Sequence, residues 1–174
     1  GSASATGVVL DNDNTGTGEP NDGDKPTVSI AATDDKAVEG GADDPLVFTV
    51  SQDKVSNFDT TVNVKLGASD NSIEAADIAT ISYTDAAGTV VTLSTQADIA
   101  DFLTNGATIT IKAGQTTAPA ITVTVVDDAI YEQSEEMVLE ISSPVNATLG
   151  SASATGVVLD NDNTGTEEPN DGDK

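Results

Sequence analysis

An alternation of apolar and polar residues recurs along this chain in short runs, and it constrains the fold more than any other feature. The runs are rich in Val, Ile and Thr, and most are bounded by Gly, Asp, Asn or Pro. Seven of them carry the pattern, at residues 28–30, 46–50, 62–66, 109–111, 121–125, 137–141 and 157–159. Alternation with a period of two is typical of a strand with one buried face. Seven such strands predict an all-β fold, an immunoglobulin-like antiparallel β-sandwich.

The stretch between the third and fourth runs departs from this simple pattern. Two further runs, at residues 78–83 and 89–93, predict an additional hairpin. Apolar residues at helical spacing follow, with Thr95 as the expected N-cap and Gly106 as the expected left-handed stop. We therefore expect a hairpin and a short helix inserted around residues 85–106, with the helix over one end of the core.

Charge and residue types exclude several classes of function. The chain has 30 Asp and Glu against 6 Lys, a formal net charge of −24, and it has neither Cys nor His. Nucleic acid and anionic membranes need a basic patch, so neither nucleic acid nor direct membrane contact is expected. Disulfides, thiolates and imidazole groups are absent and no carboxylate pair stands out as catalytic, so we do not expect an enzyme. Metal binding is left to oxygen ligands, which favour Ca²⁺ over Mg²⁺ when carboxylates are in excess.

Most of the carboxylates lie where the expected strands end. Asp127 and Asp128 follow the fifth run, and Asp160 follows the last one. Alternate loops of a sandwich gather at one pole, so the return between these strands brings Glu132 and Glu135 to the same region. Carboxylates crowded in this way repel one another by several kcal/mol unless a cation binds. The alternative is that these acidic loops are simply solvated and keep the protein soluble.

A series of segments, in consistent order, resembles the Calx-β domain over roughly residues 26–163. The segments are residues 38–41, 46–51, 74–78, 109–115, 126–136, 146–150 and 157–163, and the acidic pattern of residues 126–136 is the most specific. The resemblance implies a sandwich of about seven strands that binds Ca²⁺ at one pole. The ligands that it implies are Glu39, Asp77, Asp127, Asp128, Glu132, Glu135, Asp160 and Asp162. The chain departs from the family in lacking the usual glycine and tyrosine around Asp77, and in its insertion at residues 85–106.

The two ends of the chain carry nearly the same sequence. Residues 1–25 recur as residues 150–174, and only Gly18 differs from its counterpart, Glu167. A repeat of this length indicates a piece of a tandem array. The expected organisation is the last strand of a preceding repeat at 1–10 (a duplicate of 150–159), an acidic linker at 11–25, a Calx-β-like sandwich at 26–163 and the start of the next linker at 164–174.

The linkers add weaker metal candidates. The sequence from Asp11 resembles the start of an EF-hand loop, with oxygen ligands at alternate positions followed by Gly, although no helices flank it. A simpler interpretation is that linker carboxylates join the pole of the preceding module and stiffen the joint. A plain soluble spacer is a further alternative. The weaker candidates are Asp11, Asp13, Asp22, Asp24 and Glu136.

Residues 1–10 are amphipathic, yet the module that they would complete is not part of this sequence. An unpaired segment of this kind can extend or replace an identical strand in another molecule. We therefore expect these residues to be disordered or to pair with a neighbouring molecule.

Three functions fit these features. The first is a Ca²⁺-binding structural extender module of a large extracellular adhesin of the repeats-in-toxin (RTX) type, on a bacterial cell surface or secreted. Near-identical consecutive repeats suit a protein whose function depends on its length, because every copy then makes the same contribution. The partners would be the neighbouring repeats, and Ca²⁺ would rigidify modules that project a distal binding domain in adhesion and biofilm formation.

The second function is a Ca²⁺-sensing regulatory Calx-β domain of an ion exchanger or other membrane protein. Such a sensor would bind Ca²⁺ more tightly and would need few, divergent copies. The third is a module that recognises carbohydrate or protein. Sugar sites usually need exposed aromatic rings, and the chain has only 3 Phe, 2 Tyr and no Trp.

Overall fold

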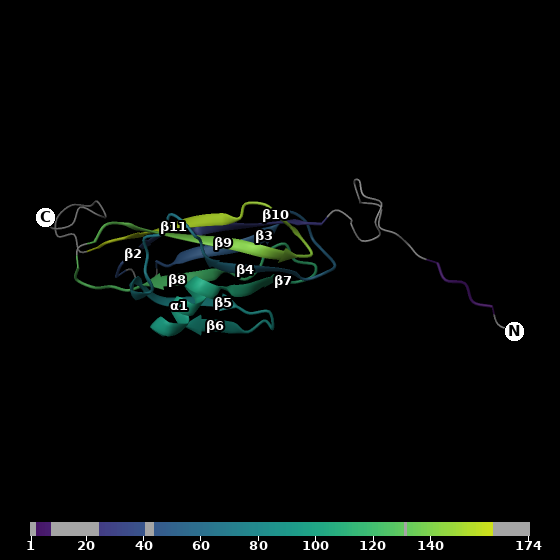
Figure 1. Cartoon of the computed structure of the whole chain (residues 1–174), viewed down its shortest axis with the longest axis horizontal. Helices are drawn as coiled ribbons and strands as arrows, with labels where there is room; N and C mark the ends of the chain where they lie inside the picture. The colour runs from purple at the N-terminus through teal and green to yellow at the C-terminus, as the bar shows by residue number, and fades with distance from the viewer. Residues whose placement is uncertain (1–2, 8–24, 41–43, 131, 162–174) are drawn as a thin grey trace.

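The structure is a computed structural model that describes residues 3–7, 25–40, 44–130 and 132–161. Two β-sheets pack face to face and form a sandwich (Figure 1). The 6-stranded sheet has the order β10-β1-β3-β8-β5-β6, and the 5-stranded sheet has the order β2-β11-β9-β4-β7. The strands are β1 (Thr27–Asp34), β2 (Lys36–Val38), β3 (Leu46–Gln52), β4 (Thr60–Leu66), β5 (Ile78–Thr84), β6 (Val90–Leu93), β7 (Ala107–Ile111), β8 (Ile121–Val125), β9 (Glu135–Val145), β10 (Thr148–Leu149) and β11 (Ser153–Leu159).

All seven strands expected from the alternation are present, as β1, β3, β4, β7, β8, β9 and β11, so the predicted β-sandwich is confirmed. The pairings among these seven strands are antiparallel. Two short edge strands were not predicted: β2 pairs in parallel with β11, and β10 pairs in parallel with β1. They have three and two residues, which is too short for an alternating pattern to be visible.

The predicted insertion is confirmed as the hairpin β5–β6 followed by helix α1 (Gln96–Asn105). The Thr95 hydroxyl accepts a hydrogen bond from the backbone N–H of Asp98, which caps the helix at its N-terminus. Gly106 ends the helix with a φ of 76°, a conformation that suits glycine. The helix connects β6, an edge of one sheet, to β7, an edge of the other; it packs against β4 and β5 and buries Ile99 and Phe102 against the core.

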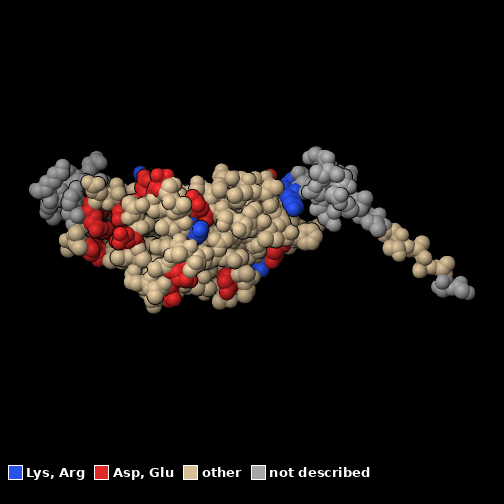
Figure 2. Space-filling view, in the orientation of Figure 1, with Lys and Arg blue, Asp and Glu red and all other residues tan. Residues whose placement is uncertain are grey.

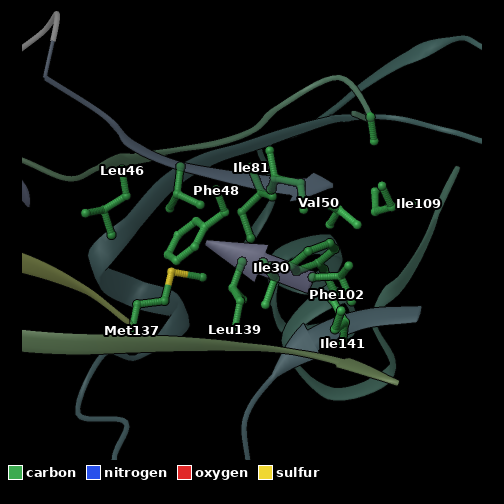
Figure 3. Close-up of a cluster of buried hydrophobic side chains, with 14 of the residues drawn as sticks. Ile30, Leu46, Phe48, Val50, Ile81, Phe102, Ile109, Met137, Leu139 and Ile141 are labelled. Atoms are coloured by element: carbon green, nitrogen blue, oxygen red, sulfur yellow. The ribbon is translucent and has the colours of Figure 1, made fainter. Parts of the chain in front are cut away.

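The core is aliphatic with a few large side chains at its centre. Phe48 from β3 faces Met137 from β9 across the two sheets, beside Leu46 and Leu139 (Figure 3). All four side chains are completely buried. Burial of apolar surface at roughly 25 cal/mol per Å² is the main force that holds the sheets together.

The antiparallel topology divides the loops between two poles. At one pole β1, β4, β8 and β11 end, and β3, β5, β7 and β9 begin. At the other pole β1 begins, and the β3–β4 and β7–β8 connections turn back. The chain therefore enters the sandwich at one pole and leaves it at the other. Among the described residues no helix is long and apolar enough to cross a membrane.

Candidate metal centre

Three strands of the 5-stranded sheet place a carboxylate on the core face at one pole of the sandwich. Glu39 follows β2 and Asp160 follows β11, each two residues beyond a buried apolar side chain. Glu135 begins β9, two residues before the buried Met137. Because side chains two apart in a strand share a face, all three carboxylates are directed inward. Only 6% of Glu39 and 2% of Asp160 is exposed.

The strand register brings these three carboxylates together. Val38 of β2 lies opposite Leu159 of β11, and the N–H of Glu39 donates to the carbonyl oxygen of Leu159 at 3.0 Å. On its other side β11 pairs with β9, where Val158 lies opposite Glu135. The acids that follow or begin these strands therefore line up along one end of the sheet. This region, with the loop of residues 127–134 and Asp77, is the acidic pole.

The loop between β8 and β9 folds back over these side chains. The N–H of Glu132 donates to Oδ2 of Asp160 at 2.9 Å, which ties the loop to the end of β11. The N–H of Ile130 donates to Oδ1 of Asp128 at 2.7 Å, a local turn that holds the first part of the loop. Figure 2 shows carboxylates gathered at this end of the sandwich, where β2 and β11 end.

Asp77 reaches the acidic pole from a separate segment. It closes the short 3-10 helix η1 (Ala75–Asp77), where its Oδ2 accepts a hydrogen bond of 2.5 Å from the N–H of Glu74. Its carbonyl oxygen accepts from the N–H of Val126 at 2.8 Å, so it lies beside the end of β8. Asp77 is thereby held next to the acidic loop that follows β8.

The pKa values show how closely these groups approach one another. The pKa of the Glu135 carboxyl is raised from 4.5 to about 7, first by burial, then by the negative charges of Asp77, Glu132 and Glu39, and last by a hydrogen bond with Asp77. Burial also raises the pKa of Glu132, with Asp77, Asp128 and Asp160 as the neighbouring charges. Shared repulsion of this kind means that the folded state holds these carboxylates in ionised form only at a cost in free energy.

The donor set fits a hard cation. Oε2 of Glu135 is buried and makes no hydrogen bond, although an acceptor in this position is normally satisfied. The surrounding donors are carboxylate oxygens, the ligands that Ca²⁺ prefers. Within the described residues, no three acidic side chains already stand close enough to hold a metal ion. Coordination would therefore require side-chain rotations that bring the carboxylates of the acidic pole further together.

The residues proposed as ligands fall into four groups, of which the structure describes three. The electrostatic contacts join Glu39, Asp77, Asp128, Glu132, Glu135 and Asp160 in the acidic pole. Asp127 lies at its rim, where its Oδ1 accepts a bond of 3.4 Å from Nδ2 of Asn161. Glu136 is exposed and lies on the opposite face of β9 from Glu135. Asp11, Asp13, Asp22, Asp24 and Asp162 lie outside the described residues.

Two residues of the acidic pole were missed in the sequence analysis. Asn161 joins the end of β11 to Asp127, and Gly40 lies directly beneath this contact. Gly40 has a φ of 69°, and a Cβ at this position would overlap Nδ2 of Asn161 and lie 2.8 Å from Oδ1 of Asp127. Only glycine lets the chain approach this closely. The sequence signal for it is the glycine that follows Val38 and Glu39, at the end of an edge strand.

No protein-family model matches the sequence, and no curated protein sequence is significantly similar to it. Several solved structures are similar in shape. CBD12 from CALX1.2 has 15% identity and a TM-score of 0.49, over 77% of this chain and 45% of that one. The calcium binding domain CBD12 of CALX1.1 has 13% identity and a TM-score of 0.49, over 77% of this chain and 45% of that one. The apo-form Calx CBD1 domain has 14% identity and a TM-score of 0.46, over 78% of this chain and 99% of that one. The chain thus spans less than half the length of the CBD12 proteins.

Proposed function

We propose that this module binds Ca²⁺ at its acidic pole and serves as a structural extender in an extracellular tandem-repeat adhesin of the RTX type. The observation that carries the proposal is the convergence of inward-facing carboxylates from β2, β9 and β11, with a buried oxygen of Glu135 that lacks a hydrogen bond. Carboxylates held this way against their mutual repulsion are stabilised by a divalent cation.

The ligands would come from four segments of the chain. Glu39 follows β2, Asp77 precedes β5, and Asp160 follows β11. The loop before β9 would add Asp127, Asp128 and Glu132, and β9 itself would add Glu135. Bound Ca²⁺ would supply the positive charge that this part of the protein lacks. It would also fasten the loop of residues 127–134 and the chain that leaves β11 to the body of the sandwich.

The near-identical ends of the chain support the extender role. Residues 1–25 and 150–174 repeat with one difference, as expected of consecutive copies in an array. The chain enters the sandwich at one pole and leaves it at the other, so copies joined in series would extend the protein lengthwise. Ca²⁺ at the exit pole would stiffen the start of each linker. The partners would be neighbouring repeats, outside the cell, and no catalysis is involved.

The alternative is a regulatory Ca²⁺ sensor, which would use the same carboxylates. The two functions differ in affinity, because extracellular modules bind Ca²⁺ at about 10⁻⁴–10⁻³ M and sensors at about 10⁻⁷–10⁻⁵ M. The near-identity of the repeated segments favours the extender, since a sensor gains nothing from uniform copies.

The test is a thermal melt in chelator and across a Ca²⁺ titration, with Mg²⁺ as the control cation. We expect a Ca²⁺-specific rise in Tm with a midpoint at about 0.1–1 mM. Glu135→Gln removes the charge of an inward-facing carboxylate, and it should shift the midpoint to higher Ca²⁺ by about tenfold or more. Glu136→Gln is the matched control, because it removes the neighbouring charge from the outer face of the same strand.

Each outcome of this titration decides between the functions. A micromolar midpoint would favour the sensor over the extender. No Ca²⁺-dependent rise in Tm, or equal effects of the two variants, would overturn the proposed site and leave the acidic pole as solvated surface.

A further inference from the structure

The pole opposite the acidic pole carries exposed apolar side chains. Val55 and Phe58 lie in the β3–β4 connection, and 63% and 67% of their surfaces are exposed. Val145, at the end of β9, is also exposed and lies opposite Thr61 at the start of β4. Phe58 is one of only 3 Phe in the chain. A large aromatic side chain left in water beside other apolar groups marks a surface that another molecule covers.

The loop that presents these side chains is held in place by its neighbours. Asp59 anchors one end, where its carboxylate accepts from the N–H of Ala113 at 2.8 Å and from Nζ of Lys112 at 3.1 Å. Its carbonyl oxygen accepts from Nδ2 of Asn146 at 2.9 Å. At the other end the N–H of Thr27 donates to Oδ1 of Asp53 at 2.7 Å, and the N–H of Asp53 donates back to the carbonyl oxygen of Thr27 at 3.1 Å. The exposed apolar surface is therefore preformed, which lowers the entropy cost of docking.

Lysines surround this surface. Three of the 6 lysines of the chain, Lys25, Lys54 and Lys112, lie directly before β1, after β3 and after β7, which is this pole. Figure 2 shows lysines at the end of the sandwich that lies away from the gathered carboxylates. Asp53 and Asp59 also lie here: the backbone N–H of Thr27 donates to the carboxylate of Asp53, and Asp59 forms a salt bridge with Lys112, so the charges of that pair offset each other. This surface, with Val55, Phe58 and Val145, is the lysine pole.

The order of the chain brings opposite poles of consecutive copies together. The last strand ends at the acidic pole, and the repeated segment that follows it ends in a lysine equivalent to Lys25, which precedes β1 at the lysine pole. The exit of one copy thus faces the entry of the next. The acidic pole also has an apolar group of its own, the exposed Ile130 in the middle of its loop.

We infer that the lysine pole of each module docks against the acidic pole of the preceding copy of the same chain. Phe58 and Val55 would cover Ile130, and the lysines would face the carboxylates around it. Apolar groups at the centre with complementary charges at the rim are the usual composition of a specific interface. The contact is heterologous, so it repeats along an array and turns linked modules into a stacked rod. The inference rests on the tandem arrangement in the proposed function.

Association of separate chains tests this inference. A linker of about 14 residues holds neighbouring modules at an effective concentration of roughly millimolar, so a millimolar Kd is sufficient in the array. We would record amide spectra of the ¹⁵N-labelled chain by NMR from about 0.05 to 2 mM, in chelator and again with Ca²⁺. Concentration-dependent shifts are expected at both poles together, around Phe58 and around Ile130. They should weaken several-fold when salt screens the charges.

Matched variants complete the test. Phe58→Ser should abolish the shifts at both poles. Val90→Ser should leave them intact, because Val90 is equally exposed (69%) at the same end of the sandwich but belongs to the β5–β6 hairpin and not to the β3–β4 connection. Shifts confined to one pole, or no shifts at 2 mM, would overturn the inference.

The two proposals fail separately. Glu135→Gln should weaken Ca²⁺ binding and retain the docking shifts, because Glu135 lies on the core face of β9 and not on the exposed surface around Ile130. Phe58→Ser should lose docking and keep the Ca²⁺ midpoint of the thermal melt. If Phe58→Ser also changed the Ca²⁺ midpoint of the isolated module, docking and metal binding would be one event, and the separate docking surface would be refuted.

Discussion

Replacing Glu135 by glutamine should stabilise the protein in chelator and weaken its stabilisation by Ca²⁺. In the folded state the pKa of Glu135 rises from 4.5 to about 7, mainly through burial and then through the charges of Asp77, Glu132 and Glu39. The folded state therefore binds the proton more tightly than the unfolded state does. The stability that depends on this proton is fully present below about pH 4.5, and it is lost as the pH rises to about 7.

The size of the effect follows from the same shift. One pKa unit corresponds to about 1.36 kcal/mol, so a rise of about 2.5 limits the change in the free energy of unfolding to about 3 kcal/mol. Part of the Glu135 side chain remains open to water, so screening reduces this to about 1–2 kcal/mol. Glutamine has nearly the same shape and no charge, and its amide can donate to the carboxylate of Asp77. In chelator above pH 7, Glu135→Gln should therefore be more stable than the parent by about 1–2 kcal/mol, and near pH 4.5 the two should be equal.

Urea denaturation between pH 4.5 and 8.5 in chelator measures this difference, since urea adds no ions that would screen the charges. The same series at 5 mM Ca²⁺ should reduce the advantage of the variant by about 1 kcal/mol, because the parent then gains more free energy from a ligand that the variant binds about tenfold more weakly. Glu136→Gln, on the outer face of β9, should show only a small difference. A Glu135→Gln variant less stable than the parent by the same amount at every pH would refute the reasoning.

Three further predictions concern the fold, each measured as a change in the free energy of unfolding. Gly106→Ala should lose about 3 kcal/mol or more, because its φ is positive and the new Cβ would overlap the carbonyl oxygen of Val64. Gly88→Ala, also at positive φ but with no atom within 4 Å, should lose only about 1–2 kcal/mol, and equal losses at the two glycines would contradict the overlap. Phe48→Ala should lose about 3–5 kcal/mol, and a loss under 1 kcal/mol would mean that the core tolerates the cavity. Thr95→Ala should lose about 1 kcal/mol through the N-cap of α1, and restoration by Thr95→Ser would confirm the cap.

Local patterns in the sequence determined most of the secondary structure. The seven strands, the hairpin and the helix each occupy consecutive residues, and each has a periodicity or a cap that can be seen within one segment. The position of the acids after apolar runs also indicated that they would meet at one pole. Glu135, Glu132 and Asp160 do meet there, which follows from the antiparallel order of the strands.

Only the tertiary structure decided which of these groups share an environment. The edge strands β2 and β10 form because long-range neighbours supply their hydrogen bonds, and segments of two or three residues contain no periodicity of their own. The pKa of Glu135 depends on burial and on the charges of Asp77 and Glu39, which are distant in the sequence, so it could not be inferred from the acidic pattern of residues 126–136 alone. The exposure of Phe58 is a similar case. An aromatic residue in a sequence predicts burial by default, and only the packed sandwich shows that this one lies in water beside Val55 at the lysine pole. Periodicity acts over a few residues, whereas burial and charge are set by contacts between residues far apart in the chain.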